Sequence, residues 1–248
     1  MTSSRWFLGK TIPEASARLV LLPHAGGSAA TFREWLTAGN SLEVLAVRYP
    51  GRAERLAEDP PQSLRDLAAD LAEAVSELNP LPFVLFGHSM GALIAFETCR
   101  RLAELRRRTP EALFAAGCAA PHIARQPIPD HLSDDSLIDL LRSDGADTSA
   151  LADDEMRELV MPSVRADLLA TSRYRPPQGA RLVVPIIVSS GEDDDALEPE
   201  HLTSWQLHTE ASCDWYRFTG GHFFLDEHRI ELLNLIKRTL SVQAGCPS

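Results

Sequence analysis

The sequence feature that most constrains the fold is the segment Phe83–Ala92, where a short apolar run leads through two closely spaced glycines into an apolar helical stretch. The run Phe83–Phe86 contains no polar residue, which is typical of a strand buried on both faces of a parallel sheet. From about Met90 to Arg107 the sequence has the length and apolar character of a helix. A buried strand that turns directly into a helix predicts α/β architecture.

Further apolar runs alternate with helical stretches along the chain. The predicted strands are Arg18–Leu22, Glu43–Val47, Phe83–Phe86, Ala112–Cys118, Ile186–Val188 and Asp214–Phe218. Two more helices are expected at Ser63–Leu78, which begins with a capping-box pattern, and at Asp226–Leu240. Strands and helices in alternation predict a mostly parallel central sheet flanked by helices.

The stretch from about residue 122 to 175 interrupts this alternation. It is rich in Asp, Ser, Arg and Pro and holds two helical segments, Ser133–Arg142 and Asp153–Ala170. Pro162 lies inside the second, so we expect a kink there or two helices that meet. Long insertions after a strand end are often functional, which favours a helical lid, although a surface excursion without a role gives the same pattern. The sequence therefore predicts a single domain, 1–248, with a lid insertion at about 122–175.

Charge and composition narrow the classes of function. The chain carries 24 Lys and Arg against 35 Asp and Glu, for a formal charge of −11. A field of this sign disfavours nucleic acid and anionic membrane surfaces as partners. The sequence contains no signal-peptide pattern and no apolar run of about eighteen residues, and its four cysteines are far apart without metal-ligand spacing. We therefore expect a cytoplasmic protein without a bound metal.

The residues between the central strand and its helix form the pattern Gly-x-Ser-x-Gly, from Gly87 through Ser89 to Gly91. Between a buried strand and a helix, this pattern is typical of a nucleophile elbow, a sharp turn that exposes a serine above the sheet. Glycines are needed because the strained turn leaves no room for a Cβ beside the serine. A plain Gly/Ser turn has the same residues, but the strand before it and the helix after it favour Ser89 as a nucleophile.

A serine nucleophile needs a histidine base and an acid that orients the base, and in this architecture they follow in the order Ser, acid, His. His222 lies on a glycine-rich loop between the last predicted strand and the last predicted helix. His201, His208 and His228 lie in helical stretches and are expected to be solvated surface residues. We therefore expect His222 to be the base.

The acid is expected in the loop after Ile186–Val188, where Asp193, Asp194 and Asp195 are adjacent. The pattern alone does not choose among these three carboxylates. His88 adjoins the nucleophile but is expected to point away from it, as a structural or pocket-lining residue.

The oxyanion that forms during serine attack requires preorganised N–H donors. The Met90 N–H, at the start of the helix after the nucleophile, is expected to supply one. The second is expected from the loop after the first long strand, where Gly26 and Gly27 allow close backbone approach and the Ala25 N–H is the natural candidate. Neither a dinucleotide-binding nor a P-loop glycine pattern is present, so no nucleotide cofactor is expected.

These motifs resemble those of the type II thioesterases of polyketide and nonribosomal peptide biosynthesis, relatives of the medium-chain thioesterase that works with fatty acid synthase. The resemblance covers nearly the whole chain and rests on Leu22–Gly27, Tyr49–Arg52 with Arg55, Phe86–Ala92, Gly191–Asp194, Trp205 and Gly220–Leu225. It implies an α/β-hydrolase fold with a helical lid and a Ser/His/Asp triad of Ser89, His222 and Asp194. Arg52 matches the family's Pro-Gly-Arg pattern, and a structural anchor is its expected role.

The resemblance further implies that the substrate is an acyl chain held as a thioester on the phosphopantetheine arm of an acyl or peptidyl carrier protein. Hydrolysis through an acyl-enzyme would clear stalled or mis-primed carriers and requires no metal or organic cofactor. A monomer is expected. Because carrier proteins are usually acidic, arginines on or near the predicted lid are candidates for a local docking patch: Arg125, Arg165, Arg173 and Arg175.

Two other functions fit part of the pattern. A small-ester hydrolase or lipase shares the serine turn and would prefer oxygen esters to carrier-bound thioesters. A carrier-binding accessory factor with a vestigial triad would have no activity, but the intact Ser89 and His222 and both predicted oxyanion loops argue against it.

Overall fold

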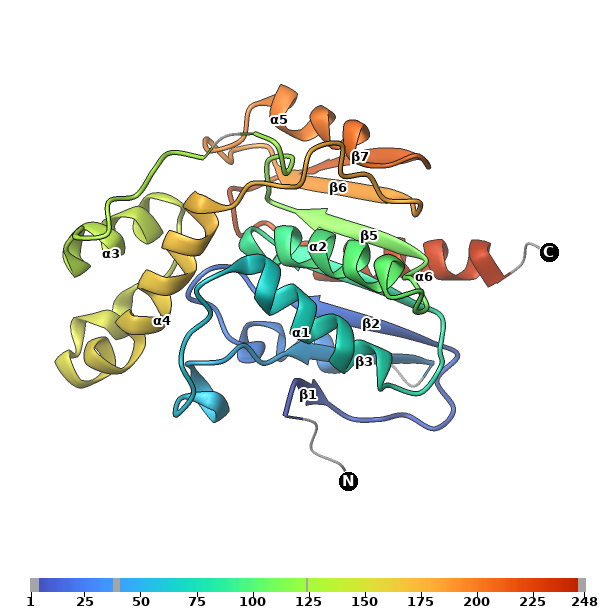
Figure 1. Ribbon diagram of the computed structural model, residues 1–248, viewed down its shortest axis with the longest axis horizontal. Coiled ribbons are helices and arrows are strands. Elements are labelled where there is room, and N and C mark those ends of the chain that lie inside the picture. The colour runs from blue at the N-terminus through green and yellow to red at the C-terminus, as the bar shows by residue number, and fades with distance from the viewer. Residues whose placement is uncertain (1–4, 38–40, 124, 245–248) are drawn as a thin grey trace.

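Seven strands form one sheet in the computed structural model, which describes residues 5–37, 41–123 and 125–244 (Figure 1). Their order across the sheet is β1-β3-β2-β4-β5-β6-β7. They span β1 (Phe7–Gly9), β2 (Ala17–Leu22), β3 (Leu42–Val47), β4 (Phe83–His88), β5 (Ala112–Ala116), β6 (Ile186–Gly191) and β7 (Cys213–Phe218). β1 pairs antiparallel with β3, and the other neighbours pair in parallel. The six predicted strands and the mostly parallel sheet are confirmed.

The two edge strands differ from the continuously apolar, buried strands that the sequence predicts. β1 has three residues and pairs Phe7 with Val47, and so short a segment carries no recognisable periodicity. β7 forms the opposite edge, and most of its side chains are exposed, including Trp215. The continuous burial expected for this strand is therefore wrong, because the flanking layers cover the centre of the sheet better than its edge.

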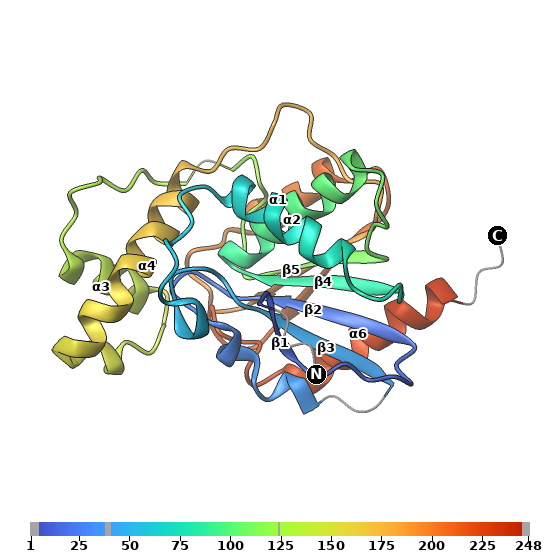
Figure 2. The same cartoon turned by 60° about the horizontal axis from the view of Figure 1, so that its bottom comes forward.

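Helices cover both faces of the sheet (Figures 1 and 2). α1 (Leu64–Ser76) and α2 (Met90–Glu104) pack on one face, and α6 (Arg229–Ala244) packs on the other. The predicted cap of α1 is present, since the Asp66 N–H donates to the Ser63 hydroxyl at 3.3 Å. The helices predicted to flank the sheet are confirmed to within a few residues at their ends.

Aromatic side chains hold the centre of the sheet on the face that α6 covers. Phe86 on β4 is fully buried, and its ring centroid lies 5.2 Å from that of Trp35, 6.4 Å from that of Phe32 and 6.2 Å from that of Phe114. Phe32 and Trp35 come from two short 3-10 turns after β2, η1 (Ala29–Phe32) and η2 (Trp35–Thr37). This cluster holds β4, and with it the turn at its carboxyl end, in a fixed position.

The segment between β5 and β6 adds two helices beyond the carboxyl ends of the strands, α3 (Asp134–Ser143) and α4 (Asp154–Arg173) (Figures 1 and 2). They share a small core of their own, made of Leu137, Ile138, Leu141, Met161 and Val164. α4 continues through Pro162 as one helix, so of the two expected outcomes, a kink or two helices that meet, the second is wrong. Packing of Met161 and Val164 on α3 stabilises the helix on both sides of the proline, which outweighs the lost backbone hydrogen bond.

The short elements that complete the fold are η3 (Ala53–Arg55), η4 (Ser149–Ala152), α5 (Pro199–Thr203) and η5 (Ser204–His208). In the part of the chain that the structure describes, no helix has both the length and the hydrophobicity needed to cross a membrane.

Replacing Phe86 with Ala should destabilise the protein by about 3–5 kcal/mol, because a fully buried aromatic side chain leaves a cavity among three other rings. Val183→Ala is the control, since Val183 is 66% exposed and its truncation should cost less than about 0.5 kcal/mol. Urea unfolding of both variants measures the difference. Equal losses of unfolding free energy in the two variants would contradict the assignment of Phe86 to the core.

Candidate active site

Ser89 lies on the turn between β4 and α2, at the carboxyl edge of the sheet. Its backbone has a φ of 53° and a ψ of −118°, in the positive-φ region that residues with a Cβ rarely adopt. The flanking glycines permit this turn, since a Cβ on Gly87 would lie 2.2 Å from the carbonyl oxygen of Gly91. Ser89 is half-buried, whereas its neighbours His88 and Met90 are buried. The strained turn therefore presents the serine where a substrate can reach it.

The first turn of α2 lies directly against the end of β2. A Cβ on Gly91 would lie 2.1 Å from the carbonyl oxygen of Leu22, so only glycine permits this approach. The contact brings the loop after β2 to the start of α2, and Ala25 and Met90 are both buried there. Within the described residues, the N–H groups of Ala25 and Met90 donate to no other group. Both predicted oxyanion donors are thus unpaired at the same edge of the sheet.

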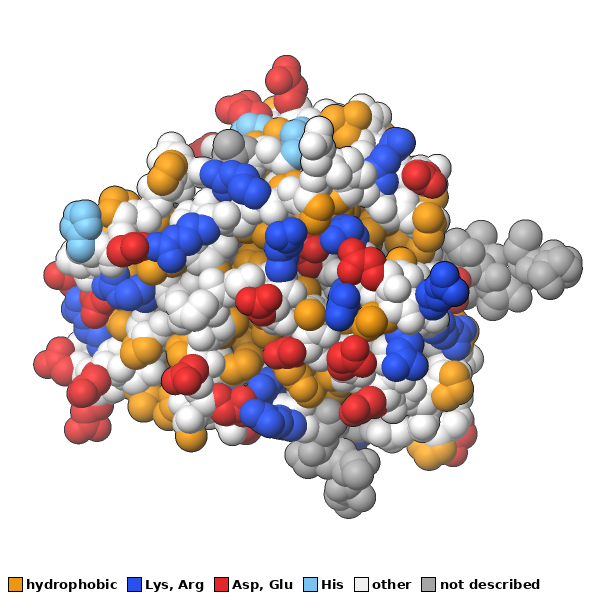
Figure 3. Space-filling model, in the orientation of Figure 1, with side chains coloured by type: hydrophobic (Ala, Val, Ile, Leu, Met, Phe, Trp, Pro, Cys, Tyr) orange, Lys and Arg blue, Asp and Glu red, His pale blue; other side chains and the backbone are white. Residues whose placement is uncertain are grey.

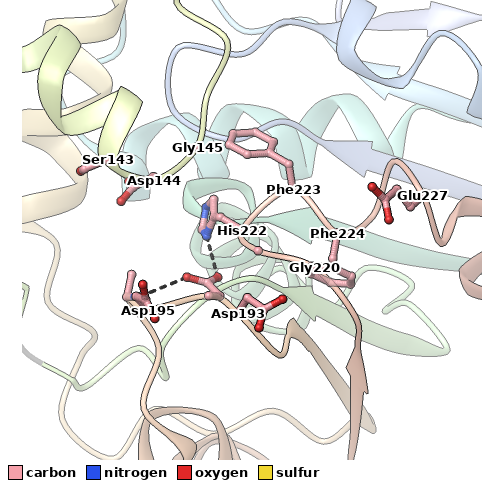
Figure 4. Close-up of a pocket in the computed structure, with 13 residues that line it drawn as sticks. Ser143, Asp144, Gly145, Asp193, Asp195, Gly220, His222, Phe223, Phe224 and Glu227 are labelled. Carbon is pink, nitrogen blue, oxygen red and sulfur yellow. Dashed lines mark hydrogen bonds and ion pairs between the residues drawn. The ribbon is translucent and has the colours of Figure 1, made fainter.

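His222 lies in the loop between β7 and α6 and is hydrogen-bonded to Asp194 in the loop after β6 (Figure 4). The Nδ1 to Oδ2 distance is 2.8 Å, and the two side chains are only 10% and 2% exposed. Because a carboxylate only accepts, this bond places a proton on Nδ1 and leaves Nε2 as the accepting nitrogen. A Cβ on Gly191 would lie 2.2 Å from the carbonyl oxygen of Gly220, so the two loops are in direct backbone contact.

The three adjacent carboxylates of the loop have different environments. Asp194 is buried and contacts His222, whereas Asp193 and Asp195 are exposed. Of the three candidates that the sequence left open, the structure brings Asp194 to the imidazole.

Ser89 and His222 both lie next to the end of β5. The Ser89 N–H donates to the Ala116 carbonyl at 2.8 Å, and a Cβ on the next residue, Gly117, would lie 3.4 Å from His222 Cε1. Among the described residues, no hydrogen bond joins the Ser89 hydroxyl to His222. Catalytic hydrogen bonds are often long without substrate and shorten in the complex. The geometry therefore places a reachable serine hydroxyl near a histidine that a buried carboxylate orients.

His88 supports the backbone of His222. Its ring centroid lies 4.9 Å from that of His222, and its Nε2 donates to the His222 carbonyl at 2.9 Å. Burial, with added repulsion from His222 and His24, lowers the pKa of His88 well below its ordinary value. His88 is therefore a neutral residue in a structural position, as the sequence predicts.

His24 lies on the other side of His88, in a place to which the sequence analysis assigns no role. Its ring centroid is 5.3 Å from that of His88 and 5.0 Å from that of Phe223, both at steep interplanar angles. Burial, followed by repulsion from His222 and Arg52, lowers the pKa of His24 to about 4. The imidazole is neutral near pH 7 and packs as an aromatic ring.

The remaining downstream histidines are less exposed than the sequence predicts. His201 and His228 are half-buried, and His228 precedes α6 and contacts the Thr219 hydroxyl at 3.0 Å. His208 is buried, with its Nδ1 3.0 Å from the Ala180 carbonyl, so its assignment to the solvated surface is wrong. The contact to Ala180 is a tertiary one, which the polarity of the surrounding helical stretch does not indicate.

A groove of about 390 Å³ opens beside His222 (Figure 4). The loops 143–145, 193–196 and 220–224 line it together with Glu227. Partial burial raises the pKa of Asp144, which lies on the α3 side of the groove. The groove gives an open path to the His222 side of the site.

No cluster of three or more His, Cys, Asp and Glu side chains suited to a metal ion occurs in residues 5–37, 41–123 and 125–244. Cys99, Cys118 and Cys213 are free thiols, and Cys246 lies outside the described residues.

A serine on a strained turn after a central parallel strand, with an acid and a histidine on loops after later strands, is the arrangement of the α/β-hydrolases. Residues 17–240 match the family model described as the thioesterase domain. The chain therefore belongs to the thioesterase family.

Individual relatives agree with this assignment. The chain is 36% identical to Thioesterase PikA5 of Streptomyces venezuelae over 240 residues, which cover 95% of this chain and 85% of PikA5. Among solved structures it resembles the type II thioesterase BorB from the borrelidin biosynthetic cluster, with a TM-score of 0.84, 36% identity, and coverage of 95% of this chain and 97% of BorB. It also resembles YbtT, a type II thioesterase from the yersiniabactin NRPS/PKS pathway, with a TM-score of 0.84, 30% identity, and coverage of 94% and 96%. The predicted fold class, the family and a hydrolase activity on thioesters are confirmed.

Stability should decrease as the pH falls from about 7 to about 4, in part through His24. Its pKa is about 4 in the folded protein against an ordinary value of 6.5, so the unfolded chain binds more protons in this interval. The contribution is therefore complete above the ordinary pKa and is lost as the pH falls towards the folded pKa. It amounts to up to about 3 kcal/mol, since one pKa unit corresponds to about 1.4 kcal/mol.

The variant His24→Asn should flatten the pH dependence of the free energy of unfolding, measured with urea. His131→Asn is the control, since His131 is exposed. Identical pH slopes in wild type and His24→Asn would show that His24 is not the residue responsible.

Proposed function

We propose that this thioesterase hydrolyses acyl thioesters on the phosphopantetheine arm of acyl or peptidyl carrier proteins, and thereby clears stalled or mis-primed carriers in polyketide or nonribosomal peptide biosynthesis. The observation that carries the proposal is the bond between Asp194 and His222 beside the strained, reachable Ser89. The substrate class is supported by YbtT, a type II thioesterase of an NRPS/PKS pathway.

In the first half of the proposed reaction, Ser89 Oγ attacks the thioester carbonyl while its proton passes to His222 Nε2. Asp194 accepts a hydrogen bond from Nδ1 and stabilises the imidazolium. The tetrahedral oxyanion receives hydrogen bonds from the unpaired Ala25 and Met90 N–H groups. Collapse breaks the carbon–sulfur bond, the pantetheine thiolate takes the proton from His222, and the acyl group remains as an ester on Ser89.

In the second half, water enters the vacated thiol position. His222 Nε2 removes a proton from the water as the oxygen attacks the acyl-enzyme carbonyl, and the same two N–H groups receive the oxyanion. Collapse returns the proton to Ser89 Oγ and releases the free acid. Both halves use this chain's own side chains and backbone, and neither step needs a metal or an organic cofactor.

The surroundings of this chemistry support further parts of the proposal. The segment from about 122 to 175, with α3 and α4, lies beyond the carboxyl edge of the sheet and is proposed to act as the lid of a single domain. The enzyme is proposed to act as a cytoplasmic monomer.

The arginines considered for carrier docking have different partners. Arg165 is paired with Asp134 at 2.5 Å and Arg173 with Asp130, so carboxylates of the same segment offset these charges. Arg125 and Arg175 donate to backbone carbonyl groups instead. The proposed docking patch is therefore reduced to Arg125 and Arg175.

The substrate class is tested with acetyl and propionyl groups presented on a carrier protein, on free pantetheine and as simple oxygen esters. Release from the carrier should exceed release from the oxygen ester, and Ser89→Ala should lower kcat/KM for the carrier substrate by at least about 10³-fold. A preference for oxygen esters would indicate a small-ester hydrolase. Activity that survives in Ser89→Ala would contradict the catalytic assignment.

The acid is tested by comparing three matched variants. Asp194→Asn should lower kcat by roughly 10³- to 10⁴-fold, because the amide favours the wrong imidazole tautomer. Asp193→Asn and Asp195→Asn should stay within about twofold of wild type, since exposed side chains without a role have little effect. Steady-state kinetics on the carrier substrate distinguishes them, and a comparable loss in either control would reassign the acid.

A further inference from the structure

We propose that Arg52 and Asp167 are positioning residues, and that their buried ion pair holds the loop 23–27 so that the Ala25 N–H points at the oxyanion. The inference rests on the proposed function and deepens it, because it concerns the same site. Asp167 lies on α4, and Arg52 lies in the loop after β3. Neither residue is a participant in the bond-making steps.

The ion pair is buried and is joined by two hydrogen bonds. Asp167 is 0% and Arg52 7% exposed. Arg52 Nη1 donates to Asp167 Oδ2 at 2.6 Å, and Nη2 donates to Oδ1 at 2.7 Å. This paired geometry defines the orientation of both side chains. Burial by itself lowers the pKa of Arg52, but the charge and hydrogen bonds of Asp167 outweigh it and raise the pKa, so the guanidinium remains charged.

Each member of the pair also binds the backbone of the loop. The Gly26 N–H donates to Asp167 Oδ2 at 2.8 Å, and Arg52 Nη1 donates to the Gly27 carbonyl at 3.0 Å. Two residues before Ala25 in the chain, the Pro23 carbonyl accepts a hydrogen bond from the buried Tyr49 hydroxyl at 3.2 Å. The backbone is therefore held before and after Ala25, whose own N–H is left unpaired.

Orientation of this N–H is the property that the chemistry needs. An oxyanion donor acts because it is already aligned when charge develops, and a displacement of about 1 Å costs roughly 10²-fold in rate. The loop contains Gly26, with a φ of 74°, and Gly27, and glycines resist conformational change least. One internal bond closes the turn, from the Gly27 N–H to the His24 carbonyl at 3.0 Å, and the external hydrogen bonds fix the position of this turn relative to the sheet and α4.

A contribution to folding stability does not by itself explain why Arg52 and Asp167 form a buried ion pair. Replacing a buried ion pair with apolar residues is often neutral or stabilising, because desolvation offsets the Coulombic attraction. The protein has a second buried pair, Arg18 Nε with Glu43 Oε1 at 2.5 Å, between neighbouring strands and away from the loop 23–27. The two pairs have the same chemistry, and only one of them contacts the oxyanion loop.

The test compares Asp167→Asn with two matched controls. Glu43→Gln makes the same carboxylate-to-amide change in the second buried pair. Tyr174→Phe removes another buried polar contact at the C-terminal end of α4, the bond from the Tyr174 hydroxyl to Glu97 Oε1 at 2.8 Å. For Asp167→Asn, kcat on a carrier-bound thioester should fall by about 10- to 100-fold, while KM changes by less than about threefold. Both controls should keep kcat within about threefold of wild type. This should hold even where a control lowers the unfolding midpoint as much as Asp167→Asn does.

A second readout separates positioning from general damage. A trifluoromethyl ketone analogue of the acyl group forms a tetrahedral adduct with Ser89 and uses the oxyanion donors, whereas an amide analogue binds as a ground state. The affinity of Asp167→Asn for the ketone should fall by the same factor as kcat/KM, and its affinity for the amide should stay within about twofold. Arg52→Lys keeps the charge but loses the two-bond geometry, and should show the same selective loss.

Three results would overturn the inference: a wild-type kcat in both Asp167→Asn and Arg52→Lys, an equal kcat loss in the controls, or an equal weakening of ketone and amide binding. Failure of the proposed function has a different signature, since Ser89→Ala would then retain thioester hydrolysis. All assays are made on the full chain, well below each variant's unfolding midpoint.

Discussion

The active-site arrangement depends on one close backbone contact, between Gly91 at the start of α2 and the carbonyl oxygen of Leu22 at the end of β2. The approach leaves no room for a Cβ, so α2 lies against the end of the neighbouring strand. The contact joins two loops that are distant in sequence, one with Ser89 and Met90 and the other with Ala25. Parallel pairing of β2 with β4 places both loops at the same edge, and the buried Arg52–Asp167 pair then connects that edge to α4.

Parallel pairing also brings the acid and the base together. β6 and β7 pair so that Gly191 lies opposite Phe218, and the loops that carry Asp194 and His222 begin side by side. Glycines again allow the contact, at Gly191 and Gly220. The proposed chemistry therefore comes from loops held on a rigid sheet, which is how a site keeps its groups aligned before substrate arrives.

The sequence predicts much of this fold because buried parallel strands are apolar runs and because the serine turn needs glycines at given spacings. It does not choose among Asp193, Asp194 and Asp195, whose chemistry is identical, since burial of one of them depends on contact between two distant loops. The sequence does not indicate a role for Asp167 for a similar reason. This residue lies in an ordinary amphipathic stretch, 115 residues from Arg52, and only the folded chain brings the two side chains together. Pro162 within α4 and the buried His208 likewise depend on tertiary packing that local patterns do not contain.

The most direct test of the central claim, that Ser89 is the nucleophile of a thioesterase, is labelling with a fluorophosphonate followed by peptide mass spectrometry. One phosphonyl group per chain is expected, on the peptide that contains Ser89, and carrier-thioester hydrolysis should be lost in proportion to labelling. Hydrolysis that persists when Ser89 is fully labelled, or that is lost while Ser89 is unmodified, would contradict it.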